Sequence, residues 1–330
     1  TQGSKFQVNS FYESDMSVQS ITALNDGGFV VTWHEVGGNY YYDSYAQMYD
    51  ASGNTVSDKL QVDISAPPSV TSLNDGGFVI TWNAAGVYAQ MYDANGNAVG
   101  SVIQADNHNT WGLSAPSITA LNDGGFVVSW EKTNDSQENV VLAQIYDANG
   151  TAVDTVFQVN NTPLSYATSS QLNPSIAALN DGGFVITWDD GISDAGNIYA
   201  QIYDANGNTI KDDFQLNTFP AHHQSPNQTV TALNNGGFIL SWGTNYEIYA
   251  QMYDASGIAV GSLLKVNEHN PTITDIYGRT QNTDYSSKPT ITTTVFDDGG
   301  FIITWWVYYQ NNNAQTKYYI NAQRYDAEGN

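Results

Sequence analysis

The 330-residue sequence contains no cysteine. A chain without cysteine has no disulfide framework, no thiol nucleophile and no cysteine-ligated metal site. Basic residues are also scarce, because nine Lys and Arg stand against 33 Asp and Glu, a formal net charge of −24. Such a surface repels the phosphates of nucleic acids and of anionic lipids, so we expect no nucleic-acid partner. The acidity suits a medium rich in divalent cations, or only the solubility of an aromatic-rich chain.

Long apolar runs and helical patterns are absent as well. No stretch approaches the ~18 consecutive apolar residues of a transmembrane helix, so we expect no direct membrane insertion. The first residues, Thr1–Ser4, have neither the charged nor the apolar region of a signal peptide, which indicates a mature chain or a part of a longer one. No stretch shows sustained helical periodicity, and this favours an all-β fold class.

One long phrase is present six times. Leu-Asn-Asp-Gly-Gly-Phe-Val-Val-Thr-Trp at 24–33 returns with small changes at 73–82, 121–130, 179–188, 233–242 and 296–305. Each copy is followed by Ala-Gln-x-Tyr-Asp-Ala-x-Gly, and the first five also by a segment of the Phe-Gln-Val-Asn type. The glycine pairs of successive copies lie 48 to 63 residues apart. This spacing fits a four-stranded propeller blade and is too long for one coil of a β-helix.

Each repeat contains four short segments, A to D, with strand-like patterns separated by turn signals. Asn-Asp-Gly-Gly links A to B, with glycines where a tight hairpin needs positive φ. A turn of the Asp-Ala-Asn-Gly type links C to D. Strand A carries small residues, as expected near a crowded central axis, and strand B is apolar on both sides, as expected between neighbouring blades. The repeats predict a six-bladed β-propeller of four-stranded antiparallel blades.

We expect one propeller domain over residues 1–330, and the predicted blades are 18–63, 68–106, 116–160, 174–217, 228–267 and 289–330. The last repeat reaches Asn330 without a strand D, whereas the chain begins with a strand-D phrase, Phe6-Gln7-Val8-Asn9. We therefore predict that residues 5–9 complete the sixth blade and close the ring, which removes its sheet edges.

The two faces of such a propeller differ in this sequence. Because strands alternate in direction, the A–B and C–D turns share one face (the turn face), and the B–C loops and D-to-A connections share the other (the loop face). The turn face is nearly the same in every repeat. The loop face varies, and its longest pieces are His34–Ser44, Asn107–Ala115, Asn161–Asn173, Thr218–Asn227, Glu268–Lys288 and Trp306–Tyr319. Long loops on a rigid scaffold are where function usually resides.

The loop face collects all five histidines, both tryptophans outside strand B and many tyrosines. Exposed aromatic side chains suit stacking on sugar rings or on peptide side chains. The same residues could instead pack the loops onto the blades. The candidate ligand-binding residues are Trp111, Trp306, Tyr40, Tyr41, His108, His222, Tyr246 and Tyr308.

Three sets of recurring residues have a structural interpretation and a functional one. The strand-B tryptophans (Trp33 and its equivalents) fit inter-blade packing better than sugar platforms. The strand-C glutamines (Gln47 and its equivalents) fit hydrogen bonds between strands better than ligand contacts. The turn aspartates (Asp50 and its equivalents) fit turn capping better than Ca²⁺ binding, because the turns lack the alternating oxygen ligands and bidentate Glu of an EF-hand.

Catalytic and metal sites stay open alternatives. The carboxylates near the ends of strand B could form the pair that glycoside hydrolysis requires; they are Glu35, Glu131, Asp189 and Asp190. A Tyr/His pair with Arg279 or Lys132 could abstract a proton beside a uronate carboxylate, as in a polysaccharide lyase. His222-His223, with His108 or His269, could hold a metal. No local motif distinguishes these from solvated loop charges.

The three recurring phrases together resemble repeats of very large secreted Gram-negative proteins, the type I-secreted adhesins of the RTX kind. The resemblance covers all six repeats and essentially the whole chain outside the loops. It implies an extracellular or cell-surface, calcium-rich setting and a monomeric domain within a longer chain. The RTX nonapeptide Gly-Gly-x-Gly-x-Asp is absent, so calcium binding is not carried over.

We therefore expect a secreted, lectin-like module of an adhesin that binds a glycan or cell-surface polysaccharide with its loop face. Irregular loops favour one asymmetric site. A hydrolase or lyase acting on polysaccharide through the same face is the first alternative, and a structural or protein-docking domain is the second. Ca²⁺ is the one cofactor that we consider.

Overall fold

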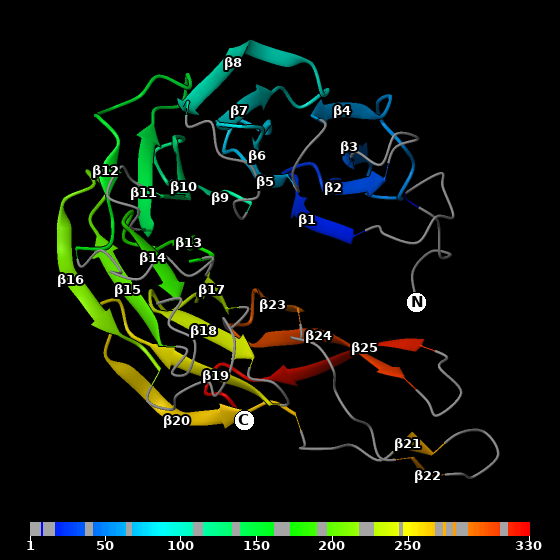
Figure 1. Cartoon of the computed structure of the whole chain (residues 1–330), viewed down its shortest axis with the longest axis vertical. Helices are drawn as coiled ribbons and strands as arrows, with labels where there is room; N and C mark the ends of the chain where they lie inside the picture. Colours follow the sequence, from blue (N-terminus) through cyan, green and yellow to red (C-terminus); the bar gives the residue numbers. More distant parts are fainter. Residues whose placement is uncertain are drawn as a thin grey trace. The chain divides into compact units, whose positions relative to one another are not determined.

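The structure is a computed structural model, shown as a cartoon in Figure 1. The residues that it describes are 8, 17–36, 42–63, 68–107, 115–133, 139–161, 172–189, 197–217, 228–243, 247–267, 273–274, 280–281, 290–310 and 316–330. All regular secondary structure in these ranges is β-strand. No helix found there has the length and apolar character needed to cross a membrane.

Six antiparallel sheets follow one another along the chain, one for each repeat, and we number them blades 1 to 6. Blade 1 contains β1 (Ser17–Ala23), β2 (Phe29–Val36), β3 (Tyr42–Tyr49) and β4 (Leu60–Asp63). Blade 2 contains β5 (Ser69–Ser72), β6 (Phe78–Asn83), β7 (Val87–Tyr92) and β8 (Ala98–Asp106). Blade 3 contains β9 (Ser117–Ala120), β10 (Phe126–Thr133), β11 (Asn139–Tyr146) and β12 (Phe157–Gln158).

The second half of the chain repeats this order. Blade 4 contains β13 (Ser175–Ala178), β14 (Phe184–Asp189), β15 (Ile198–Tyr203) and β16 (Thr209–Gln215). Blade 5 contains β17 (Gln228–Ala232), β18 (Phe238–Gly243), β19 (Ile248–Tyr253) and β20 (Ala259–Lys265). Blade 6 contains β23 (Thr290–Val295), β24 (Phe301–Gln310) and β25 (Thr316–Tyr325). A small hairpin, β21 (Ile273–Thr274) with β22 (Thr280–Gln281), lies in the connection before blade 6.

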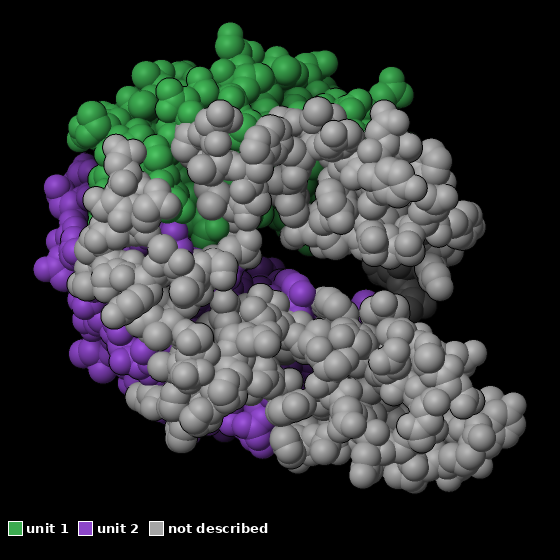
Figure 2. Space-filling model, viewed as in Figure 1, with its two compact units in different colours: residues 1–134, 140–159 green, residues 135–139, 160–330 purple. Residues whose placement is uncertain are grey.

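The chain divides into two compact units, coloured separately in Figure 2. Unit 1 comprises residues 1–134 and 140–159 and holds blades 1 to 3; unit 2 comprises 135–139 and 160–330 and holds blades 4 to 6. Within unit 1 the strands A of successive blades, β1, β5 and β9, contact one another in turn. Within unit 2, β13, β17 and β23 do the same. The all-β, six-bladed propeller fold is therefore confirmed.

The A–B turn uses each residue of Asn-Asp-Gly-Gly for a different purpose. In blade 1 the Asp26 carboxylate accepts a hydrogen bond of 2.8 Å from the Gly28 amide. Gly27 has φ of +86°, a conformation that L-residues rarely adopt. A Cβ on Gly28 would lie 2.5 Å from the carbonyl oxygen of Tyr49 in strand C, so only glycine lets the backbones approach. Asn25 donates through its side chain to the carbonyl of Asn74 in the next blade, at 3.2 Å.

The C–D turn is held by its aspartate. In blade 4 one oxygen of the Asp204 carboxylate accepts hydrogen bonds of 2.8 Å from the backbone amides of Asn206 and Asn208. The other oxygen accepts a hydrogen bond of 2.9 Å from the side-chain amide of Asn208. These bonds lower the pKa of the Asp204 carboxyl, with the Asn208 side chain the largest cause. The two backbone bonds recur at Asp50, Asp93, Asp147, Asp254 and Asp326. The capping interpretation of these aspartates is confirmed.

The core consists of strand B sandwiched between blades. The strand-B tryptophans are almost fully buried, and Trp33, Trp130 and Trp242 are 2% exposed or less. Each strand-B phenylalanine stacks on the last tyrosine of strand C, as in Phe184–Tyr203 with ring centroids 4.8 Å apart. The strand-C glutamines of blades 2, 4 and 5 reach strand D, and Gln90 donates to the Val99 carbonyl at 2.9 Å. The packing and strand-tying interpretations are both confirmed.

Among the described residues, blade 6 ends on β25 with no strand paired to its outer edge. Ile320 of β25 is 83% exposed, whereas Ile248, at the same position of blade 5, is 1% exposed. Ala322 is also exposed, whereas Ala250 is buried. In blades 1 to 5 a strand D pairs with strand C. The exposed apolar residues of β25 therefore lie where a fourth strand would cover them.

The predicted closing segment, residues 5–9, lies outside the described residues except for Val8. Val8 packs against Val31, Trp33 and Tyr49 of blade 1. Leu216, its equivalent in strand D of blade 4, belongs to one core cluster with the corresponding Leu240, Trp242 and Tyr253 of blade 5. Val8 thus has the contacts that a strand D makes with the blade that follows it. The pairing of residues 5–9 with β25, and the single-domain interpretation, stay predictions.

Candidate functional site

The loop face begins where strand B ends, and the residue after each strand-B tryptophan differs from blade to blade. In blades 2, 3 and 4 this residue is Asn83, Glu131 and Asp189, which are 5%, 4% and 0% exposed. Buried carboxylates are uncommon unless they are paired or hydrogen-bonded. The polar loop-face ends of these strands are therefore the best-defined part of the candidate site.

In unit 1 a polar cluster connects blades 2 and 3. Asp106, at the end of β8, accepts a hydrogen bond of 3.0 Å from the indole nitrogen of Trp130 in β10. Its other oxygen forms an ion pair of 3.1 Å with Lys132, whose side chain is 31% exposed. The buried Glu131 lies between Trp130 and Lys132 in β10, so its side chain points to the opposite face of the strand. The cluster therefore places one carboxylate and one ammonium group at the base of the B–C loop.

In unit 2 a buried polar network joins blades 4 and 5. Asn173 donates to the Asp189 carboxylate at 3.1 Å, and the Asp189 amide donates to the carbonyl of Leu172 at 3.0 Å. Gln228, the first residue of β17, donates to the Asn173 carbonyl at 2.8 Å and accepts from Thr187 at 2.6 Å. Asn173 has φ of +41°, which asparagine tolerates better than most residues. This network fixes the Asp189 carboxylate at the end of β14.

A third polar group lies at the loop-face rim of blade 5. Glu247 accepts a hydrogen bond from the Tyr249 hydroxyl and forms an ion pair of 2.7 Å with Lys265. Burial, and then Glu247, raises the pKa of Tyr249 to about 12, so its hydroxyl stays protonated at neutral pH. The Tyr249 ring stacks on Trp242 with centroids 5.8 Å apart. This aromatic and charged rim could contact a polar, hydroxyl-rich ligand.

The structure leaves most of the predicted ligand-binding residues untested. Six of them lie outside the described residues: Tyr40, Tyr41, His108, Trp111, His222 and Tyr246. Their role stays a prediction. The histidines proposed for a metal site, with Glu35 as a side chain and Asp190, are likewise not described.

The prediction that Trp306 and Tyr308 belong to an irregular loop is wrong. Both lie in β24, which pairs with β25 without interruption from Phe301 opposite Tyr325 to Gln310 opposite Thr316. Aromatic and β-branched residues favour extended backbone, so this segment continues the hairpin instead of leaving it. The described part of the B–C connection of blade 6 is therefore a two-stranded extension of the hairpin, with 306–310 opposite 316–320.

Metal binding finds no support within the described ranges. No group of three or more His, Asp or Glu side chains there could hold a metal ion. The turn aspartates direct their oxygens at backbone amides of their own turns, as described for Asp204.

Comparisons with known proteins agree with the fold. No protein-family model matches the sequence, and no curated protein matches it. Among solved structures, one similar chain is a protein of unknown function from Dyadobacter fermentans, with 13% identity, a TM-score of 0.55 and 92% of each chain covered. Another is an α-L-arabinanase from Penicillium chrysogenum in complex with arabinobiose, with 14% identity, a TM-score of 0.55, and 92% and 93% of the two chains covered. At these identities the likeness concerns the fold alone.

Sequence reasoning missed several members of these clusters. For Asp106 a signal is present, because its repeat has Asp where the repeats of blades 3 to 5 have Asn. Gln228 stands where the repeats of blades 2 to 4 have proline, and this departure from the pattern marks it. Glu247 occupies a position that differs in every repeat, so no pattern in the sequence marks it.

Proposed function

We propose that this chain is an extracellular, lectin-like module of a bacterial adhesin that binds a carbohydrate with its loop face. One observation carries the proposal. The recurring polar side chains of the turn face serve the fold in every described repeat, as caps and as contacts between blades. The loop face has no such uniformity, and its variable segments hold the aromatic residues suited to sugar stacking.

The arabinanase that shares this fold is described in complex with a disaccharide. That observation concerns the arabinanase, and it supports the present proposal only as a precedent for sugar binding on a similar scaffold. The adhesin setting and the secreted location rest on the resemblance of the repeats. A role for Ca²⁺ is part of the proposal to be tested, because an acidic chain in a calcium-rich medium could use the ion in its loops.

The test is a glycan-array screen of the purified chain, with Ca²⁺ and again with EDTA. We expect saturable binding to a defined glycan. Trp111→Ala or Trp306→Ala should weaken it by about tenfold, since aromatic contacts contribute up to about 1.5 kcal/mol. Ser256→Ala, an exposed change on the turn face, is the matched control and should bind like the unaltered chain. Absence of binding to any glycan of a broad array, both with Ca²⁺ and with EDTA, would reject the proposal in favour of protein docking or a structural role.

A second candidate, a glycoside hydrolase, has one specific observation in its favour. Glu131 and Asp189 are buried at the loop-face ends of strands B in their respective units. Hydrolases use such carboxylates as general acid and as nucleophile or base. The two residues belong to different units, so each is tested separately as a catalytic group of its own unit. If bound polysaccharide is shortened, Glu131→Gln or Asp189→Asn should abolish the release of reducing ends while glycan binding persists. Unchanged release in one of these variants excludes the altered residue from catalysis.

A further inference from the structure

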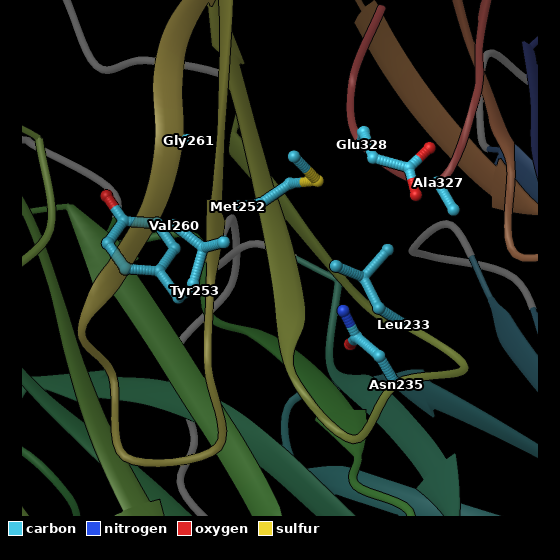
Figure 3. A pocket seen from close by; sticks show the side chains of 8 residues that line it. All are labelled: Leu233, Asn235, Met252, Tyr253, Val260, Gly261, Ala327 and Glu328. Atoms are coloured by element: carbon cyan, nitrogen blue, oxygen red, sulfur yellow. The ribbon is translucent and has the colours of Figure 1, made fainter.

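The turn face of unit 2 contains a cavity between blade 5 and the C–D turn of blade 6. It has a volume of about 330 Å³ (Figure 3). Leu233, Met252 and Val260 supply apolar walls, and the Glu328 carboxylate lies across from the Met252 side chain. Gly261 of β20 forms part of the outer wall. The cavity is therefore apolar at its base and carries a negative charge at its rim.

The gap between blades 4 and 5 shows what fills the same place one repeat earlier. There Lys211 of β16 donates through its ammonium group to the carbonyls of Ser256 and Gly257, at 3.0 and 3.2 Å. The ammonium group also lies 3.8 Å from the centroid of the Phe214 ring. A lysine side chain thus runs over an apolar wall and ends on two backbone carbonyls of the next blade's turn.

The two gaps are equivalent position by position. Gly257 of blade 5 packs against Phe214 and Ile202, and Gly329 of blade 6 packs against Leu264 and Met252. The carbonyls that correspond to those of Ser256 and Gly257 belong to Glu328 and Gly329. The residue that corresponds to Lys211 is Gly261, which has no side chain, so blade 5 supplies no ammonium group to this turn.

We infer that this cavity, which we call the blade 5–6 pocket, binds a primary alkylammonium group such as the side chain of a lysine. The alkyl part lies against Met252, Leu233 and Val260, which line the cavity. The ammonium group bonds the carbonyls of Glu328 and Gly329, as Lys211 bonds their equivalents, and gains the Glu328 carboxylate, which replaces the neutral Ser256. The net charge of −24 attracts such a cation to the chain.

The binding test uses the four methionines as reporters. The chain labelled with ¹³C in its methionine methyl groups is titrated with n-butylammonium and followed by NMR. Met252 should shift saturably. Met48 lies at the equivalent position against Gly96, where Ser57 takes the place of Gly261, and should stay unmoved. n-Butanol, which has the same tail without the charge, should shift Met252 much less. An equal response to both compounds, or no saturable shift of Met252, would overturn the inference.

Two variants test the polar part of the site. Glu328→Gln removes an exposed carboxylate and should weaken n-butylammonium binding about two- to fivefold, the range of an exposed ion pair. Lys211→Ala should open an equivalent pocket between blades 4 and 5. The Ile202 methyl resonance of this variant should then respond to n-butylammonium, and the amine should raise its melting temperature. If Lys211→Ala shows no new response to n-butylammonium, the contacts of Lys211 do not represent those of a bound amine, and the inference is overturned.

The source of the amine is distinguished with two further probes. Nα-acetyl-lysine methylamide should bind, and its Nε-acetylated form should not, if a lysine of a partner protein is the ligand. Stronger binding of cadaverine than of the lysine derivative would indicate a free polyamine. The inference does not depend on the proposed carbohydrate function, because Trp111→Ala and Trp306→Ala should leave the Met252 response unchanged.

Discussion

Asp106 and Asn217 occupy the same repeat position, the end of the strand-D phrase. The difference between a carboxylate and an amide at this position changes the hydrogen-bond acceptor that is offered to the strand-B tryptophan of the next blade. The two oxygens of Asp106 accept bonds from Trp130 and Lys132. Asn217 has a single acceptor oxygen, and it accepts from the Ile198 amide of its own blade at 2.8 Å. The indole nitrogen of Trp242 in the following blade is buried without a hydrogen-bond partner among the described residues. Because the one oxygen of the Asn217 amide accepts within its own blade, the side chain has no second acceptor oxygen for the indole, whereas the carboxylate of Asp106 has one.

We predict that Asp106→Asn destabilises the chain by about 1–3 kcal/mol, because the Trp130 indole loses its acceptor while it stays buried. Chemical denaturation monitored by tryptophan fluorescence measures the loss. Lys132→Ala is the control. It removes only the half-exposed ion pair and should cost less than about 1 kcal/mol. Equal, small losses in the two variants would show that the indole hydrogen bond contributes little.

At the scale of the element, the C–D turn is the most regular unit of the chain. Its aspartate accepts bonds from two backbone amides in every described repeat. An asparagine side chain is the largest cause of the lowered carboxyl pKa in Asp50, Asp93 and Asp204, and a backbone amide is the largest in Asp147, Asp254 and Asp326. A carboxyl whose pKa is lower in the folded state than in the unfolded state stabilises the fold above its unfolded pKa. This contribution is lost as the pH falls through the folded-state pKa.

We therefore predict that the melting temperature is steady near neutral pH and falls as the pH drops below about 4. In Asp204→Asn one of these carboxyls is absent, so the difference in melting temperature between pH 7 and pH 2.5 should be smaller than in the unaltered chain. Asp58→Asn, an exposed change outside the turns, should leave that difference as it is. An identical acid response in Asp204→Asn and the unaltered chain contradicts a stabilising role for the turn carboxylate.

The elements also show where sequence reasoning works and where it stops. The turns and strands B and C were predictable, because residues equivalent to Gly27, Trp33 and Asp50 stand at the same place in every repeat. Each of these residue types fits one local structure there: a positive-φ turn, a buried strand and a capped turn. The length of β24 was not, because Trp306 to Tyr309 lie in one blade only and give no repeat signal. The polar clusters around Asp106, Asp189 and Glu247 depend on contacts between blades, which a pattern within one repeat does not contain.

At the scale of the whole molecule, one asparagine side chain in each of blades 1, 2, 4 and 5 connects successive A–B turns. Asn25, Asn74, Asn180 and Asn234 each donate to backbone carbonyls of the next turn. In blade 6 the corresponding residue is Asp297, whose carboxylate has no hydrogen to donate at neutral pH. If the ring closes as the sequence predicts, the connection from blade 6 to blade 1 is the one in which this position cannot supply the donor.

Asp297→Asn is therefore predicted to stabilise the closed ring by about 0.5–1.5 kcal/mol, the usual contribution of one hydrogen bond. Thermal unfolding of the variant measures the gain. Asn234→Ala, which removes an existing connection between blades 5 and 6, should lower the melting temperature by a similar amount. A normal loss in Asn234→Ala with no gain in Asp297→Asn would argue that blade 1 does not follow blade 6.

These asparagine contacts have a consequence for how such chains evolve. Donor and acceptor recur in nearly every repeat, so a duplicated or deleted blade meets neighbours that already carry its partners. Recombination between repeats can then change the number of blades without inventing a new interface. Selection is left free to diversify the opposite face one loop at a time, and a lineage can acquire new ligands without rebuilding the scaffold that presents them.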